Sequence, residues 1–251
     1  MLKTRVIPCL LLKDNRLIKT IQFGEYRNIG SYIAAVKVFN ARDVDELVFL
    51  DMSASLEGRD PLYHLISDVA RECFMPLAVG GGVQTLDHIA RLLGVGADKV
   101  VLNTSALDHP EFITQGAGRY GAQCIVVSID VKKTDRGYEV YRDHGKNPTG
   151  LDPITWAKEA ESRGAGEIFL TSIDQDGMMK GYDIGLTKSV AEAVSIPVIA
   201  SGGAGDLNHF VEVIRDGRAD AVAAASIFQY TQYTPQDIKQ HLIKSGIPAR
   251  L

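Results

Sequence analysis

The chain repeats part of its own sequence, and the repeat restricts the folds that it can adopt. Residues 76–107 read PLAVGGGVQTLDHIARLLGVGADKVVLNTSAL, and residues 197–228 read PVIASGGAGDLNHFVEVIRDGRADAVAAASIF. Both begin with proline, pass through a glycine-rich turn and share an apolar pattern. One inserted residue then aligns Asp98 with Asp220 and Thr104 with Ser226. A match of this length, in one order, indicates two fused halves that fold alike.

Short apolar runs alternate with amphipathic segments along the whole chain, as strands alternate with helices. We predict strands at residues 5–11, 46–51, 76–79, 99–103, 124–130, 167–171, 197–200 and 221–225. Among the helical segments between them are residues 31–40, 61–74, 85–96, 153–164, 185–194, 206–217 and 234–246. Eight strands alternating with eight helices predict an α/β fold, a (β/α)8 TIM barrel made of two duplicated half-barrels. We expect residues 1–251 to form this single domain.

A doubly wound open sheet is the main alternative, but no GxGxxG fingerprint follows the first strand. The segment at residues 134–152 is too long for a simple loop. We predict a small hairpin there, lying over one end of the barrel, with Tyr138–Tyr141 as its first strand.

Charge and cysteine content narrow the class of protein. The net charge of −4 argues against general nucleic-acid binding. No apolar run reaches the ~20 residues that a membrane helix needs, and the N-terminus has no signal-peptide pattern. The three cysteines are widely spaced and form no CxxC pair, which is typical of a reduced, cytoplasmic compartment. No metal-ligand or cofactor motif is present, so we expect neither a metal nor a cofactor.

The repeat places matching glycine-rich turns, at residues 79–83 and 201–205, where strands of the barrel end. Glycine lets backbone N–H groups approach a phosphate closely. Small polar residues follow one strand later, Asn103 and Thr104 in one half and Ser226 in the other. The duplicated turns predict two phosphate sites on opposite sides of the barrel mouth. The alternative is that the glycines only make tight turns.

Carboxylates at strand ends are candidates for proton transfer. Asp130 directly follows the apolar strand CIVVSI and is the strongest candidate. Asp51 and Asp174 could equally cap a helix or hold a loop. Position 11, which corresponds to Asp130 in the first half, carries Leu11 instead of an acid.

The opposite end of the barrel also carries a pattern of charges. Four strands begin with Arg5, Glu46, Lys99 and Glu167. If these side chains point inward, two cations and two anions form a self-neutralising ring that could gate a small molecule, since unpaired charges inside a barrel are costly. The alternative is that they face solvent.

Many of these stretches together resemble one known family. They read RVIPCL, DELVFLD, VGGG, GADKV, NTSAL, SID, PTGLD, GAGEIFLTSID, KGYD, IPVIASGGAG and AAS, in order over nearly the whole chain. They are similar to HisF, the cyclase subunit of imidazole glycerol phosphate synthase, a lyase. The resemblance implies a duplicated barrel with a HisH-type glutaminase docked at its N-terminal face. Ammonia would cross the barrel to the mouth, where HisF converts PRFAR to imidazole glycerol phosphate and AICAR.

The resemblance also assigns site residues. It implies an ammonia gate made of the four charges Arg5, Glu46, Lys99 and Glu167, and one catalytic acid at Asp130. A phosphorylated substrate would meet the mobile loop at Lys19 and two phosphate sites. Those sites map onto Gly82, Asn103, Thr104, Asp176, Gly177, Gly203 and Ser226.

The chain departs from HisF at Leu11, where the family has its second catalytic aspartate. Leucine neither accepts nor donates a proton, and Asp14 lies beyond the strand end. The stretch RVIPCLLLKD resembles a HisF-type paralogue of surface-polysaccharide gene clusters, which with a glutaminase supplies ammonia for acetamidino-sugar formation, a separate amidotransferase being a further candidate partner. A true HisF in histidine biosynthesis and a non-catalytic scaffold for a glutaminase remain alternatives. A HisA-type isomerase is disfavoured because it also needs an acid near position 11.

Overall fold

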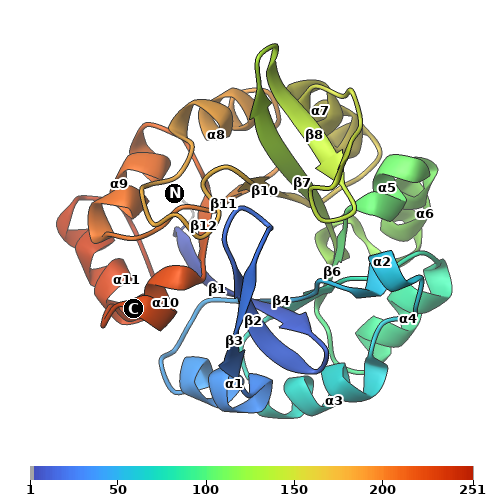
Figure 1. The fold of residues 1–251 in the computed structure, drawn as a ribbon, viewed down its shortest axis with the longest axis horizontal. Helices are drawn as coiled ribbons and strands as arrows, with labels where there is room; N and C mark the ends of the chain where they lie inside the picture. Colours follow the sequence, from blue (N-terminus) through green and yellow to red (C-terminus); the bar gives the residue numbers. More distant parts are fainter. Residues whose placement is uncertain (1–2, 251) are drawn as a thin grey trace.

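The computed structural model describes residues 3–250, and these form a closed barrel of parallel strands with helices outside it (Figure 1). The order around the barrel is β1, β4, β5, β6, β7, β10, β11 and β12. β10 pairs with β7 and β12 pairs with β1, so the sheet has no free edge along this path. The strands are β1 (Arg5–Lys13), β4 (Leu47–Asp51), β5 (Leu77–Gly80), β6 (Lys99–Leu102), β7 (Ile125–Thr134), β10 (Glu167–Ser172), β11 (Val198–Ser201) and β12 (Ala221–Ala224). The predicted TIM barrel is confirmed, and the open sheet is excluded.

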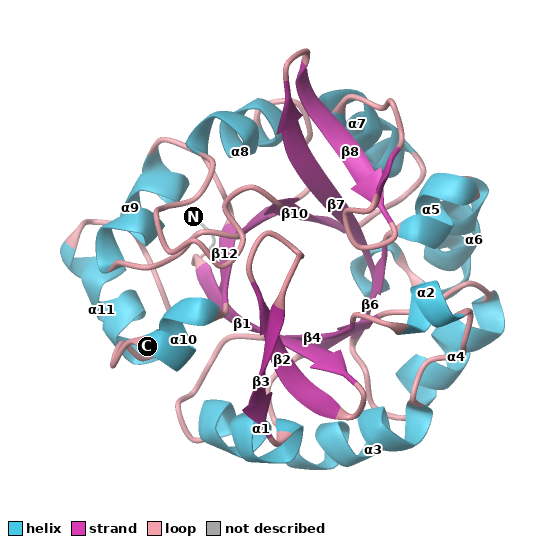
Figure 2. Ribbon diagram, in the orientation of Figure 1, coloured by secondary structure: helices cyan, strands magenta, loops and turns pink. Residues whose placement is uncertain are grey.

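One helix covers each strand on the outside (Figure 2). They are α1 (Tyr32–Asn40), α3 (Tyr63–Glu72), α4 (Leu86–Gly94), α6 (Glu111–Tyr120), α7 (Pro153–Ser162), α8 (Ile184–Ala191), α9 (Leu207–Arg215) and α11 (Pro235–Lys244). Three shorter helices follow strands at the mouth, namely α2 (Ala54–Glu57), α5 (Thr104–Asp108) and α10 (Ser226–Tyr230). A 3₁₀ turn, Ala122–Cys124, precedes β7. None of the helices between residues 3 and 250 has the length and apolarity to cross a membrane.

Each half of the barrel begins with a strand that continues into an antiparallel hairpin. β1 pairs with β2 (Arg16–Thr20), which pairs with β3 (Tyr26–Gly30). β7 pairs with β8 (Gly137–Arg142), which pairs with β9 (Asn147–Pro148). The predicted hairpin in 134–152 therefore exists, but Tyr138–Tyr141 lies in its second strand. β7 runs past Asp130 to Thr134 and supplies the first.

The repeated residues have equivalent structural tasks in the two halves. Asp98 accepts the backbone N–H of Leu77 at 2.8 Å, and Asp220 accepts that of Val198 at 2.9 Å, so each carboxylate fastens its own strand to the preceding one. The repeat also contains a histidine. In the second half this is His209, which accepts the N–H of Asp206, the residue that caps the start of α9. Structural needs therefore account for much of the repeat.

Strand alternation divides the core into two layers. Apolar side chains of one set pack between strands and helices, while the other set fills the barrel. The inner set comprises Ile7, Cys9, Leu11, Ile18, Val48, Met52, Ala78, Val101, Val126, Phe169, Ile199, Ala221 and Ala223. Three of these side chains are alanines, and the set fills the barrel between the charged starts of the strands and the mouth.

Candidate active site

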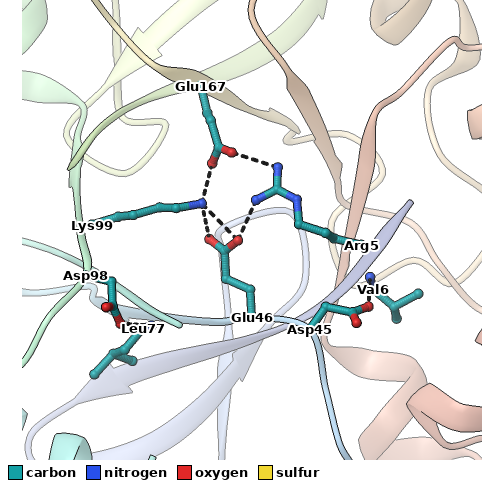
Figure 3. A network of polar contacts seen from close by, with 8 residues as sticks. All are labelled: Arg5, Val6, Asp45, Glu46, Leu77, Asp98, Lys99 and Glu167. Carbon is teal, nitrogen blue, oxygen red and sulfur yellow. Dashed lines mark hydrogen bonds and ion pairs between the residues drawn. The ribbon is translucent and has the colours of Figure 1, made fainter. Parts of the chain in front are cut away.

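The four charged residues at the strand starts point into the barrel and form a closed ring (Figure 3). Arg5 contacts Glu46 at 2.5 Å and Glu167 at 2.8 Å through its two terminal nitrogens. The Lys99 ammonium contacts Glu46 at 2.9 Å and Glu167 at 2.8 Å. Each cation thus bridges both anions, and the alternative of four solvent-facing charges is wrong.

Burial makes the pairing in this ring necessary. The Glu46 side chain is 2% exposed and that of Glu167 is 13% exposed. Burial opposes the charge of Arg5, but attraction to Glu46 and Glu167 outweighs this effect, so the pKa of Arg5 is raised. Removal of one cation would leave a buried carboxylate without its partner, which is strongly unfavourable.

A cavity of about 570 Å³ opens at the other end of the barrel. Its volume lies in the range typical of small-molecule sites. Every barrel strand, or the turn after it, contributes to the lining through Leu11, Leu50, Gly81, Val101, Asp130, Thr171, Ser201 and Ala223. The cavity therefore lies at the C-terminal ends of the strands, where barrels of this type carry their active sites.

Asp130 is held at the wall of this cavity by neutral hydrogen-bond donors. The Asn103 amide donates to one carboxyl oxygen at 3.2 Å, and the Ser128 hydroxyl donates to the other at 3.3 Å. Burial raises the pKa of Asp130 to about 7, against the effect of Ser128 and with a further contribution from Asp176. A carboxyl group that titrates near neutral pH can both donate and accept a proton.

Other carboxylates at the mouth have structural partners. Asp51 accepts two hydrogen bonds from Arg59, at 2.8 and 2.9 Å, and caps the backbone at Ser53. Asp174 accepts the Lys133 N–H at 2.7 Å. The sequence left open whether Asp51 and Asp174 transfer protons or hold the structure. Their contacts fit the structural role.

Leu11 also lines the cavity and is 8% exposed. It pairs with Leu50 on one side and with Ile18 on the other, within the inner apolar cluster. Asp14 is exposed in the turn after β1 and is not part of the cavity wall. The mouth is therefore polar beside Asp130 and apolar beside Leu11.

The β2–β3 hairpin is fastened across the mouth (Figure 1). The Lys19 ammonium donates to the Cys9 carbonyl at 3.2 Å, and the Thr20 hydroxyl donates to Asp176 at 2.8 Å. Burial lowers the pKa of Lys19 and raises that of Asp176, although the two groups partly offset each other through their attraction. Lys19 lies in strand β2 of the hairpin, is 4% exposed and does not line the cavity.

The residues assigned to phosphate binding divide into two groups. The cavity wall includes Gly82, Asn103, Thr104, Asp176 and Ser226, but not Gly177 or Gly203. Thr104 and Ser226 are the first residues of the equivalent short helices α5 and α10, as the repeat suggests.

Close packing explains the two remaining glycines. A Cβ atom on Gly177 would lie 2.3 Å from the Thr20 carbonyl oxygen, and one on Gly203 would lie 2.0 Å from the Gly181 carbonyl oxygen. Both have positive φ angles, 72° and 108°. Tight packing requires glycine at these positions even without a ligand.

His144 is a residue of the cavity wall that sequence patterns do not identify. It lies between β8 and β9, and its ring packs edge-on against Phe23 at 6.0 Å. Burial lowers the pKa of His144 to about 4, so its ring is neutral at neutral pH. A single histidine in an irregular polar segment has no motif, and only the fold of the two hairpins brings it to the mouth.

A family model described as "Histidine biosynthesis protein" matches residues 5–234. The match covers the barrel from its first strand to the start of the last helix, and so includes both the charge ring and the cavity.

Proposed function

Because the chain belongs to the histidine biosynthesis protein family, a family of HisA- and HisF-type barrel enzymes, we propose that it is a HisF-type synthase subunit that receives ammonia from a HisH-type glutaminase. The observation that carries the proposal is the closed ring of Arg5, Glu46, Lys99 and Glu167 at one end of the barrel, opposite a large cavity at the other end. An isomerase that works only at the mouth has no need of such a ring.

In this proposal the glutaminase docks at the N-terminal face, where the ring lies. Ammonia passes the ring and then crosses a barrel interior lined by apolar side chains, among them Ala78, Ala221 and Ala223. These side chains offer no hydrogen bond that would retain ammonia. At the mouth, ammonia meets a phosphorylated substrate beside Asp130.

We infer further that the chain is the paralogue that supports acetamidino-sugar formation. The support is Leu11, which makes the mouth opposite Asp130 apolar. Loss of one general acid–base group costs about 10²–10⁴ in rate, so cyclisation would be impaired while ammonia delivery would be retained. The second candidate is a true HisF in histidine biosynthesis, which the retained Asp130, Asn103 and cavity favour.

Rescue of a histidine auxotroph that lacks HisF separates these candidates. We expect the unmodified chain to fail and the Leu11→Asp variant to restore growth, because the new carboxylate would stand across the mouth from Asp130. Asp130→Asn combined with Leu11→Asp is the control and should not rescue. Full rescue by the unmodified chain would rule out the paralogue.

The ammonia route is tested with Arg5→Met and Lys99→Met, each assayed together with a HisH-type glutaminase that binds the unmodified chain. Both variants remove charge-assisted hydrogen bonds worth about 1.5–3 kcal/mol each, so we expect at least a ~10-fold loss of glutaminase stimulation or of ammonia transfer. Lys37→Met, which breaks an exposed pair with Glu72 on the outer helices, is the matched control. Normal coupling in both ring variants would contradict the gate.

A further inference from the structure

A second buried ion pair lies next to the ring. Lys239 of α11 is 2% exposed, and its ammonium donates to Asp45 at 2.9 Å and to the Asp43 carbonyl at 2.7 Å. The Asp45 side chain is 1% exposed. A lysine so deeply buried loses its hydration, and these contacts replace it.

The other oxygen of Asp45 accepts the backbone N–H of Val6 at 2.9 Å. Val6 follows Arg5 in the chain, and Asp45 precedes Glu46, as Figure 3 shows beneath the ring. One carboxylate therefore joins the two backbone segments that carry two neighbouring members of the ring.

Stability alone is a weak reason for such a pair. Apolar side chains of similar volume often replace a buried ion pair at no cost to stability. What an apolar pair cannot do is fix the relative positions of two backbone segments through directional bonds to Val6 N–H and the Asp43 carbonyl.

We propose that Lys239 and Asp45 are positioning residues that close the ring, because they hold the Arg5 and Glu46 segments at the distance at which the two side chains meet. The importance of this closure for ammonia transfer rests on the function proposed above. The ion pair also links helix α11 to the segment that carries Glu46.

A bond of the same kind elsewhere in the barrel supplies a matched control. Asp220 accepts the Val198 N–H at 2.9 Å, the same kind of bond as that between Asp45 and Val6, but it precedes Ala221, which is not a ring member. A variant at Asp220 loses an equivalent bond between β11 and β12, two strands that carry no ring member.

The test measures the ring directly, on the isolated chain, by NMR of the Arg5 guanidinium protons, assigned with Arg5→Lys. In the native protein, contacts to Glu46 and Glu167 hold these protons and slow their exchange with water. We expect exchange to rise about tenfold or more in Lys239→Met and in Asp45→Asn, the factor that loss of one charge-assisted hydrogen bond corresponds to. Asp220→Asn should leave the exchange rate unchanged.

Single variants leave one buried charge unpaired and could unfold. The double variant Asp45→Asn/Lys239→Met removes both charges, and we expect it to fold and still to show fast Arg5 exchange. Native exchange rates in the folded double variant would overturn the proposal. Because this readout needs no glutaminase, its failure is distinct from failure of the ammonia-transfer function, which the coupling assay measures separately.

Discussion

Leu11 and Asp130 occupy equivalent places in the two halves, since each is the residue at which a barrel strand pairs with its hairpin. Leu11 pairs with Ile18 of β2, and Asp130 pairs with Tyr141 of β8. Their surroundings differ, because only Asp130 has amide and hydroxyl donors within hydrogen-bond distance. The difference between the halves is therefore a property of the local wall and not of the barrel as a whole.

The pKa of Asp130 predicts a specific dependence of stability on pH. The carboxyl has a pKa of about 3.9 when unfolded and about 7 when folded. Between these values the folded state holds the proton more tightly, so this group makes the free energy of unfolding fall as pH rises from about 4 to about 7.

Asp130→Asn removes this loss of stability with rising pH. The free energy of unfolding of the variant, minus that of the native chain, should therefore increase by on the order of 2–3 kcal/mol from about pH 5 to about pH 8. Urea denaturation at both pH values measures the gain. An equal effect at the two pH values would show that Asp130 is not a carboxyl with a raised pKa.

At the scale of elements, sequence patterns identified the eight barrel strands because each is a short apolar run bounded by turns. They missed the β2–β3 hairpin, because β3 is largely exposed and polar and is held by pairing with β2, while β2 is fastened by the bond from Thr20 to Asp176. They also gave no clear signal for α6, where Gly116 and Gly118 interrupt the helical pattern. Gly116 is closely packed, because a Cβ there would lie 3.0 Å from the Cδ1 atom of Ile125 and would require that side chain to shift.

The residues of the candidate site also divide into those that the sequence identified and those that it did not. Charges and acids at strand ends could be located from the sequence, because a strand fixes the direction in which its side chains point. The contacts that the two hairpins make could not be predicted from the sequence. These contacts bury Lys19 and bring His144 to the cavity.

The bond from Thr20 to Asp176 predicts how firmly the β2–β3 hairpin is held. Thr20→Val keeps the shape of the side chain but loses this bond. A loss of about 1–2 kcal/mol corresponds to roughly 5–30-fold faster local opening. Hydrogen exchange of the amides in residues 16–30 measures it.

The second hairpin provides the control. Thr134→Val removes the bond to the Gly137 carbonyl in the turn between β7 and β8. It should accelerate exchange there and leave residues 16–30 unchanged. If Thr20→Val leaves amide exchange in residues 16–30 at the native rate, the hairpin is held by packing instead.

At the scale of the whole molecule, the barrel consists of two four-stranded units that meet at two seams. β6 meets β7 at one seam, and β12 meets β1 at the other. The second seam also brings together residues from the first and last parts of the described chain, since the Thr4 N–H donates to the Pro248 carbonyl at 2.8 Å and Thr4 pairs with Ala249. The order of the two halves in the chain can therefore be exchanged without moving a strand.

A circular permutant tests whether the halves are folding units. Residues 1 and 251 are joined by a short Gly/Ser linker, and the chain is opened between Gly121 and Ala122, in the turn before β7. Both halves stay continuous, and altered loop closure changes stability by only about 1 kcal/mol, so we expect near-native stability and refolding rate.

The control permutant is opened after Phe74, an exposed residue in the equivalent type of turn before β5. That opening divides the first half, so its strands must pair across the whole chain, and longer-range pairing slows folding. Stopped-flow refolding compares the two, and equal or reversed rates would show that the barrel folds as one unit in spite of its duplicated sequence.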